Sequence, residues 1–171
     1  MVSTKKHYLV INASHFANSN TERFCRLFEQ NLEAVSSSRI ELRKKNIPFA
    51  DGTYRLPRDK VLEQLREQVL DCDGMFIATP THWFSAPGRL KAFIDHLTPI
   101  EAKLWKRERL LGLAIYAPEG GELGVFQSVV PALNHMGFSL VGSGYAYRRN
   151  RRKSEQWVVK EIKGMAKRFS R

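Results

Sequence analysis

A run of small polar side chains follows the first apolar segment of the sequence, and it could bind an anion. The run spans residues 13–21 and contains four side chains that can donate hydrogen bonds: Ser14, Ser19, Asn20 and Thr21. Apolar residues at helical spacing begin just after it, at Phe24. Because the N–H groups and the dipole of a helix N-terminus favour anions, this loop could hold a terminal phosphate without a cationic side chain. The same pattern is also typical of a plain helix N-cap.

A second loop, rich in aromatic side chains, follows the most apolar strand candidate. Residues 75–78 form an uninterrupted apolar run, which is typical of a parallel strand buried on both faces. Pro80 ends the run because proline has no N–H group for the ladder, and Thr-His-Trp-Phe-Ser follows. Ligands of open α/β sheets bind at the carboxyl ends of the strands, where such a loop suits a flat, partly polar ring. Ordinary packing of the aromatic side chains is the alternative.

The elements that must position these loops alternate between strand and helix. Short apolar runs predict five strands, at residues 8–12, 39–45, 75–78, 110–117 and from 138 onwards. Apolar residues at helical spacing predict helices at residues 24–35, 61–69, 90–97 and 126–133. Ser154 is a suitable N-cap for a last helix. This alternation predicts an α/β fold with a five-stranded parallel sheet between helices. The order 2-1-3-4-5 would bring the two polar loops together.

The composition fits a single domain in the cytoplasm. The chain has 171 residues, 43% of them apolar, and we expect one domain over residues 1–171. No apolar run reaches the ~18 residues of a membrane span, and no signal-peptide pattern opens the sequence. Cys25 and Cys72 are expected to be buried thiols in a reducing compartment. The histidines show no metal spacing, and His96, beside Asp95, is expected on a helix surface.

The end of the sequence is strongly basic. The net charge is +11, and residues 148–171 carry ten Lys and Arg against two Glu. The densest run, residues 148–153, is of a kind that can bind nucleic acid, acidic lipid or acidic partners. No aromatic side chains are interleaved with it to stack on bases, and no nucleic-acid motif accompanies it. We therefore expect a solvated, phosphate-tolerant edge without sequence-specific nucleic-acid binding.

The patterns around both loops are similar to those of a known family. Residues 13–21 resemble Gly-Ser-Pro-Arg-x-x-Ser-Asn-Thr, with Ala13 in place of the glycine and Phe16 in place of the arginine. Residues 73–96 resemble Asp-Gly-x-x-x-x-Thr-Pro-x-Tyr-x-x-x-x-x-Gly-x-Leu-Lys-x-Phe-Ile-Asp-Arg. The residues in register are Asp73, Gly74, Thr79, Pro80, Gly88, Leu90, Lys91, Phe93, Ile94 and Asp95. Both patterns belong to the NAD(P)H-dependent FMN reductases, which the chain resembles along nearly its whole length.

This resemblance implies a flavodoxin-like three-layer sandwich that binds FMN and uses NADPH or NADH as co-substrate. By position, Ser14, Ser19, Asn20 and Thr21 would hold the FMN phosphate, and Phe16 belongs to the same loop. Pro80, Thr81, His82, Trp83 and Phe84 would flank the isoalloxazine ring. Gly120 and Gly121 would bring N–H groups towards the pyrimidine end of the ring. A homodimer is also implied, because flavin sites of this family often lie beside a partner subunit.

The expected reaction is a hydride transfer from nicotinamide to FMN, followed by electron transfer to a quinone, a flavin or a similar small acceptor. The cofactor carries this chemistry, so no catalytic acid, base or nucleophile is expected. His82 could donate a proton near the ring or pack against Trp83. Two other functions stay open: a flavodoxin-type electron carrier that never meets nicotinamide, and a non-enzymatic binding module with a basic C-terminal tail.

Overall fold

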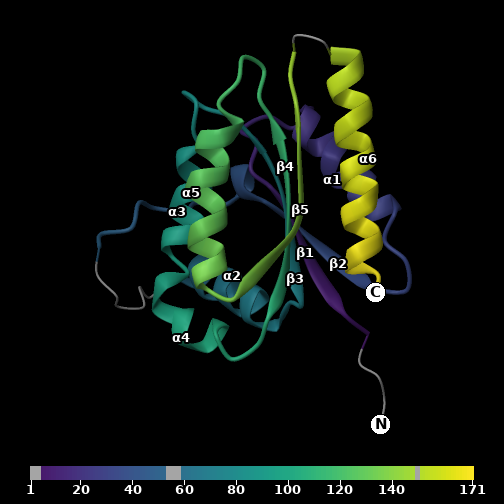
Figure 1. Ribbon diagram of the computed structural model, residues 1–171. Coiled ribbons are helices and arrows are strands. Elements are labelled where there is room, and N and C mark those ends of the chain that lie inside the picture. Colours follow the sequence, from purple (N-terminus) through teal and green to yellow (C-terminus); the bar gives the residue numbers. More distant parts are fainter. Residues whose placement is uncertain (1–4, 53–58, 149–150) are drawn as a thin grey trace.

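Five parallel strands form one sheet in the computed structural model of the protein, which describes residues 5–52, 59–148 and 151–171 (Figure 1). The strand order is β2-β1-β3-β4-β5, and every neighbouring pair is parallel. The strands are β1 (His7–Asn12), β2 (Ser36–Glu41), β3 (Gly74–Pro80), β4 (Arg109–Tyr116) and β5 (Phe138–Ala146). The predicted flavodoxin-like α/β fold and its strand order are confirmed.

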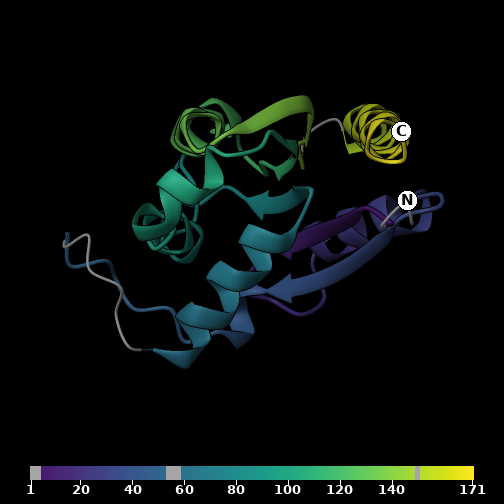
Figure 2. The same ribbon diagram turned by 90° about the horizontal axis from the view of Figure 1, so that it is seen from below.

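Helices cover both faces of this sheet, which gives the three predicted layers (Figures 1 and 2). On one face pack α1 (Asn20–Gln30) and α6 (Arg151–Phe169). On the other face pack α2 (Lys60–Asp71), α3 (Gly88–Asp95) and α5 (Glu122–His135). Three short elements complete the order: η1 (Leu42–Lys44), η2 (Thr98–Ile100) and α4 (Glu101–Leu104). Within the described ranges, no helix is both long enough and apolar enough to cross a membrane.

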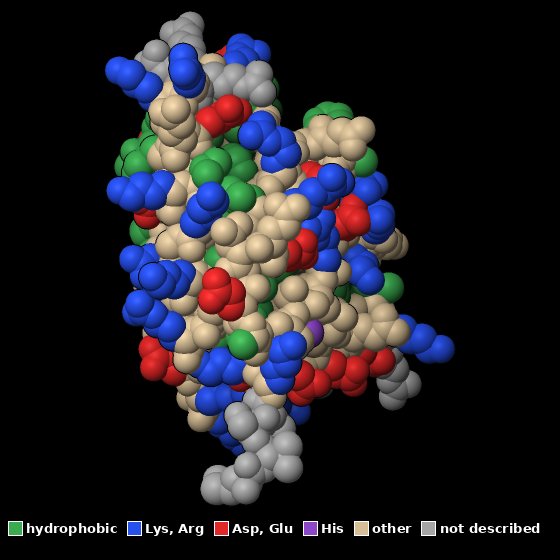
Figure 3. Space-filling view, turned by 90° about the vertical axis from the view of Figure 1, so that its right-hand side faces the viewer, with side chains coloured by type: hydrophobic (Ala, Val, Ile, Leu, Met, Phe, Trp, Pro, Cys, Tyr) green, Lys and Arg blue, Asp and Glu red, His purple; other side chains and the backbone are tan. Residues whose placement is uncertain are grey.

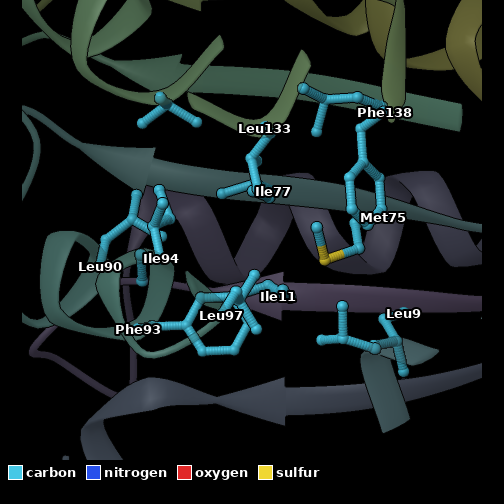
Figure 4. Packing of buried hydrophobic residues seen from close by; sticks show 14 of the residues in the cluster. Leu9, Ile11, Met75, Ile77, Leu90, Phe93, Ile94, Leu97, Leu133 and Phe138 are labelled. Carbon is cyan, nitrogen blue, oxygen red and sulfur yellow. The ribbon is translucent and has the colours of Figure 1, made fainter. Parts of the chain in front are cut away.

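Two apolar cores, one on each face of the sheet, hold the layers together. Successive side chains of a strand point to opposite faces, so β3 sends Met75 and Ile77 to one core and Phe76 to the other. The core under α2, α3 and α5 includes Leu9, Ile11, Leu90, Phe93, Ile94, Leu97, Leu133 and Phe138 (Figure 4). In the other core the ring of Phe28 stacks on that of Phe76, with centroids 4.1 Å apart. Burial on both faces explains the continuous apolar run in β3.

Parallel pairing places the carboxyl ends of β1 and β3 side by side. Asn12 is opposite Ala78, and the N–H group of Ala13 donates a 2.9 Å hydrogen bond to the carbonyl oxygen of Ala78. The loops that follow, residues 13–19 and 81–87, therefore leave the sheet at the same edge. The loop after β4, residues 117–121, leaves from this edge too, because β4 runs parallel to β3.

The limits of β2 and α1 differ from the sequence prediction. The strand predicted at residues 39–45 begins at Ser36 and ends at Glu41, where η1 follows. Both ring nitrogens of His7 lie near serine hydroxyls of β2, 2.9 Å from Ser36 Oγ and 3.0 Å from Ser38 Oγ. These polar contacts hold β2 at the edge of the sheet. Because they involve no alternating apolar residues, the sequence pattern does not show where the strand begins. The first helix ends at Gln30 instead of residue 35.

The last helix begins before its predicted N-cap. Because α6 starts at Arg151, Ser154 lies within its first turn. The Ser154 hydroxyl accepts a 3.2 Å hydrogen bond from the N–H group of Tyr147 and lies 3.3 Å from the Tyr147 carbonyl oxygen, to which it donates. Ser154 therefore ties the helix to the end of β5. Residues 149–150 of the basic run, and residues 53–58 of the loop before α2, lie outside the described residues.

The prediction that His96 lies on a helix surface is wrong. Only 8% of His96 is exposed, and its Nε2 lies 3.0 Å from the carbonyl oxygen of Pro48. The carbonyl oxygen of His96 accepts a 2.8 Å hydrogen bond from Nε of the buried Arg66. Asp95 points outward and pairs with Lys91. Adjacent helical residues point about 100° apart, so this single step along the chain separates an exposed side chain from a buried one.

Candidate functional site

A cavity of about 330 Å³ opens between the loops that follow β1 and β3. Small-molecule sites commonly have volumes of roughly 300–1,000 Å³. The lining residues are Ser14, Phe16, Asn18, Ser19, Asn20, Thr21, Pro80, Thr81, His82, Tyr116 and Pro118. The structure therefore brings most of the predicted site residues into one cavity. The remaining four, Trp83, Phe84, Gly120 and Gly121, are not among the lining residues.

Asn12, at the end of β1, organises the polar half of the cavity. Its side chain is buried, and its Oδ1 accepts two hydrogen bonds, from the N–H group of Ser14 at 3.0 Å and from the Thr21 hydroxyl at 2.9 Å. Its Nδ2 donates to Glu22 Oε2 at 3.0 Å. One buried amide thus fixes both ends of the loop relative to the sheet.

The start of α1 presents its N–H groups at this loop. Ser19 is the N-cap, and its Oγ accepts a 3.2 Å hydrogen bond from the N–H group of Glu22. The first N–H groups of a helix have no acceptor within it, which leaves those of Asn20 and Thr21 directed outward. The hydroxyls of Ser19 and Thr21 lie 2.9 Å apart. Hydroxyls and N–H groups together form an uncharged site suited to a phosphate.

Glu22, in the first turn of α1, is an acidic side chain beside this loop, and two arginines offset its charge. It pairs with Arg26 and Arg39, and it accepts the hydrogen bond from Asn12. Burial alone would raise the pKa of Glu22, but the hydrogen bonds and the charges of these arginines outweigh it and hold the pKa below its usual range. The carboxylate is therefore ionised and neutralised at physiological pH.

The aromatic half of the site is a tight hairpin turn. The N–H groups and carbonyl oxygens of His82 and Ser85 bond each other at 2.9 and 3.0 Å. The two residues between them, Trp83 and Phe84, have φ values of 47° and 60°, a left-handed conformation that glycine and asparagine normally supply in such turns. Trp83 is 97% exposed and Phe84 is 62% exposed. The turn therefore holds two strained, solvent-exposed aromatic side chains beside the cavity.

The first turn of α5 packs against this hairpin and requires glycine. Gly121 is the N-cap of α5, with φ 89°, and a Cβ there would lie 2.5 Å from Cα of Phe84. A Cβ on Gly124 would lie 2.0 Å from the carbonyl oxygen of Phe84. The N–H group of Gly120 donates a 3.3 Å hydrogen bond to Ala117. Gly121 and Gly124 therefore allow the close approach of the hairpin to α5, whereas the N–H group of Gly120, predicted to point towards the flavin ring, is bonded within the loop.

Two histidines connect the loops at the cavity mouth. The rings of His15 and His82 have centroids 4.8 Å apart. Burial lowers the pKa of His15, and the charges of His82 and Arg89 lower it further. No group of three or more His, Cys, Asp or Glu suited to a metal ion occurs among the described residues.

Replacing His82 with glutamine is expected to raise the pKa of His15 towards its ordinary value. The substitution removes the electrostatic interaction of His82 with His15, while burial and Arg89 remain and keep the pKa of His15 lowered. The pKa of His15 is lower in the folded protein than in the unfolded chain. The contribution of His15 to the free energy of unfolding is therefore complete above the ordinary pKa of histidine, and it is lost as the pH falls below that value. Titration of the His15 ring resonances by NMR in both proteins measures the shift, and an identical pKa in both would contradict the contact.

Four residues of the site were not indicated by the sequence patterns. Asn18, Tyr116 and Pro118 line the cavity, and Asn12 supports it from below. Tyr116 and Pro118 come from the end of β4, so only the strand order brings them near the other loops. Asn12 could have been found from the sequence, because its polar amide ends an otherwise apolar strand.

The sequence of this chain matches one protein family over most of its length. Residues 7–152 fit the family model described as NADPH-dependent FMN reductase. The chain therefore belongs to the NADPH-dependent FMN reductase family. This confirms the resemblance predicted from the two loops and, at the level of the family, the expected class of NAD(P)H-dependent FMN oxidoreductase.

Individual relatives agree with this assignment. The chain is 30% identical over 92 residues, 50% of its length and 49% of the relative's, to YwqN of Bacillus subtilis (strain 168), provisionally named an NAD(P)H-dependent FMN-containing oxidoreductase. It is 28% identical over 94 residues, 52% of its length and 43% of the relative's, to an NAD(P)H dehydrogenase (quinone) of Paracoccus denitrificans (strain Pd 1222). The matches thus span about half of each curated relative.

Solved structures share the fold at low sequence identity. An NAD(P)H:quinone oxidoreductase from Methanothermobacter marburgensis superposes with a TM-score of 0.76 at 12% identity, covering 98% of each chain. At this identity the similarity extends to the fold alone.

Proposed function

We propose that this chain is an FMN-dependent oxidoreductase that holds FMN in the cavity between the β1–α1 and β3–α3 loops. NADPH or NADH would be the hydride donor, and a quinone, a flavin or a similar small molecule would be the acceptor. The observation that carries the proposal is the single cavity that joins a helix N-terminus with hydroxyls to an apolar wall. A mononucleotide with a flat ring requires both halves.

The phosphate of FMN is assigned to the polar half of the cavity. Ser14, Ser19 and Asn20 offer hydroxyls and an amide, and Thr21, whose hydroxyl donates to Asn12, contributes its N–H group in the first turn of α1. Asn12 holds this loop in place before any ligand binds, so the loop loses little conformational entropy when FMN binds. Phe16, which lines the cavity but is 73% exposed, stands at its outer rim.

The ring of FMN is assigned to the half formed by Pro80, Thr81 and His82. The N–H group of Thr81 donates to Tyr116 at 3.0 Å, which fixes this wall to the end of β4. Trp83 and Phe84 extend the wall outward, and Gly120 and Gly121 lie against Phe84. Bound FMN supplies the redox chemistry of the reaction. The chain's own residues bind the cofactor, orient its ring and exclude water from one side.

The whole chain is proposed to act as one FMN-binding domain in the cytoplasm and as a homodimer. Four exposed apolar side chains of the loop edge and of α5 favour association: Phe16, Trp83, Phe84 and Leu123. Contiguous apolar patches mark interaction sites, and Leu123 lies between Gly121 and Gly124, which pack against Phe84. A second copy would cover them and shield the cavity mouth. We expect no sequence-specific nucleic-acid binding.

Anaerobic reduction of the FMN-loaded protein tests the enzymatic part of this proposal. Addition of NADPH or NADH is expected to bleach the visible flavin absorbance, and addition of a quinone is expected to restore it. Dithionite provides the positive control. Bleaching by dithionite but by neither nucleotide would contradict the enzyme and would favour a flavodoxin-type electron carrier.

A further inference from the structure

The outer side of α6 carries a line of positive charge that the proposed function does not use. Six exposed side chains form it, five on α6 and one just after its end, and we call them the α6 basic face: Lys153, Lys160, Lys163, Lys167, Arg168 and Arg171. Residues seven apart lie two helical turns apart on nearly the same side, so Lys153, Lys160 and Lys167 are aligned. At 1.5 Å per residue, the line from Lys153 to Arg168 is about 22 Å long. Figure 3 views this side and shows Lys and Arg side chains from its top to its bottom, with fewer Asp and Glu side chains among them.

No carboxylate of the described residues forms an ion pair with the α6 basic face. All ion pairs found between described residues involve other side chains. The two acidic residues of α6 contact other elements. Glu155 pairs with Arg23 of α1 at 3.3 Å, and Glu161 packs beside Gly144 of β5. A surface with an excess of one sign of charge attracts a partner of the opposite sign.

Only the outer side of α6 is available to a partner. The inner side of α6 is fully buried, with Val158, Ile162, Met165 and Phe169 packed against the sheet. The outer side presents flexible Lys and Arg side chains along the helix, which a planar anionic surface can contact together.

Aromatic side chains beside the line fit a lipid surface. Trp157 lies one turn after Lys153 and is 38% exposed, and its ring packs 4.6 Å from that of Tyr145, which is 36% exposed. Indole and phenol rings of this kind settle at the boundary between water and lipid headgroups. Clusters of four to eight Lys and Arg on a helix bind anionic lipids, each charge strengthening binding about fivefold.

We infer that the α6 basic face docks reversibly on membranes that contain anionic lipids. Binding is electrostatic, because the apolar side of α6 is buried in the protein and cannot insert into the bilayer. If the chain is a quinone reductase, as proposed above, docking brings it to acceptors dissolved in the membrane. The docking itself does not depend on that function.

Co-sedimentation with vesicles tests the inference. The full chain is mixed with vesicles of phosphatidylcholine alone or with phosphatidylglycerol added, at salt near 0.1 M and near 1 M, where the Debye length is about 10 Å and about 3 Å. Binding is expected only with phosphatidylglycerol and only at the lower salt. Equal binding to neutral vesicles, or no binding at all, would overturn the inference.

A matched pair of triple variants locates the surface. K153E/K160E/K167E is expected to bind anionic vesicles more than tenfold more weakly. The control K60E/K103E/K106E makes the same change of net charge at exposed lysines of α2, α4 and the segment after it, and it is expected to bind nearly as the parent does. Equal losses in both variants would show a net-charge effect and overturn the assignment to α6.

Two further measurements keep the result interpretable. Circular dichroism and thermal unfolding of each variant report an intact fold independently of lipid and of FMN, and K153Q/K160Q/K167Q replaces the charge reversal if that variant does not fold. Double-stranded DNA is added as a competitor at the lower salt. If DNA displaces the protein from vesicles and binds it more tightly through the same lysines, the α6 basic face is a nucleic-acid surface and the inference is wrong.

Discussion

Replacing Gly124 with alanine is expected to lower the free energy of unfolding by roughly 1–3 kcal/mol, although alanine is the better helix former. Gly124 lies in the first turn of α5, and a Cβ there would lie 2.0 Å from the carbonyl oxygen of Phe84 and 3.2 Å from its carbonyl carbon. These are backbone atoms, so no side-chain rotation relieves the overlap. The hairpin of residues 82–85 would have to move away from α5, and FMN affinity is expected to fall with it.

Gly164, inside α6, provides the matched control. A Cβ there would meet only Nη1 of Arg168, 3.9 Å away, so Gly164→Ala is expected to stabilise the protein by up to about 1 kcal/mol. Chemical denaturation of both variants measures the two effects. Stabilisation by Gly124→Ala would contradict the packing of α5 against the hairpin.

Replacing Asn12 with alanine is expected to weaken FMN binding at least about tenfold and to lower the free energy of unfolding by several kcal/mol. The substitution removes the acceptor of the Ser14 N–H group and of the Thr21 hydroxyl, and it removes the donor to Glu22. Each buried polar group left without a partner costs about 1–3 kcal/mol. The loop that presents the hydroxyls then loses its fixed geometry. FMN titration and denaturation measure the two losses.

Asn31→Ala serves as the control for Asn12. Asn31 also donates from its amide, to the carbonyl oxygen of Leu27 at 2.8 Å, but it lies at the other end of α1. This variant is expected to lose about 1 kcal/mol of stability and to bind FMN as the parent does. Unchanged FMN affinity in Asn12→Ala would show that the loop after β1 does not hold the phosphate.

The sheet and the place of the site could be predicted because they depend on apolar periodicity. The run at residues 75–78 is buried on both faces, and its alternation with helical patterns fixes a parallel sheet. Polar contacts between residues far apart in the chain produce no periodic pattern in the sequence. The start of β2 at Ser36, the role of Ser154 and the burial of His96 all depend on hydrogen bonds to residues far along the chain.

Within the site, the polar loop could be predicted and the hairpin conformation could not. Hydroxyl and amide side chains before a helix carry a local signal. Trp83 and Phe84 adopt a left-handed conformation against their own preference, which contacts with α5 enforce through Gly121 and Gly124. Local sequence therefore indicated an aromatic wall at residues 80–84, whereas the structure turns Trp83 outward to solvent.

The central claim is that the loop after β1 binds the phosphate of FMN, and comparison of FMN with riboflavin tests it most directly. Both ligands carry the same ring, and only FMN carries the phosphate. Titration followed by flavin fluorescence is expected to show micromolar or tighter binding of FMN and at least about tenfold weaker binding of riboflavin. In Ser19→Ala the FMN affinity is expected to fall by roughly 1–3 kcal/mol while riboflavin binding is unchanged. Equal affinities for the two ligands, or no FMN binding at micromolar concentrations, would contradict the account.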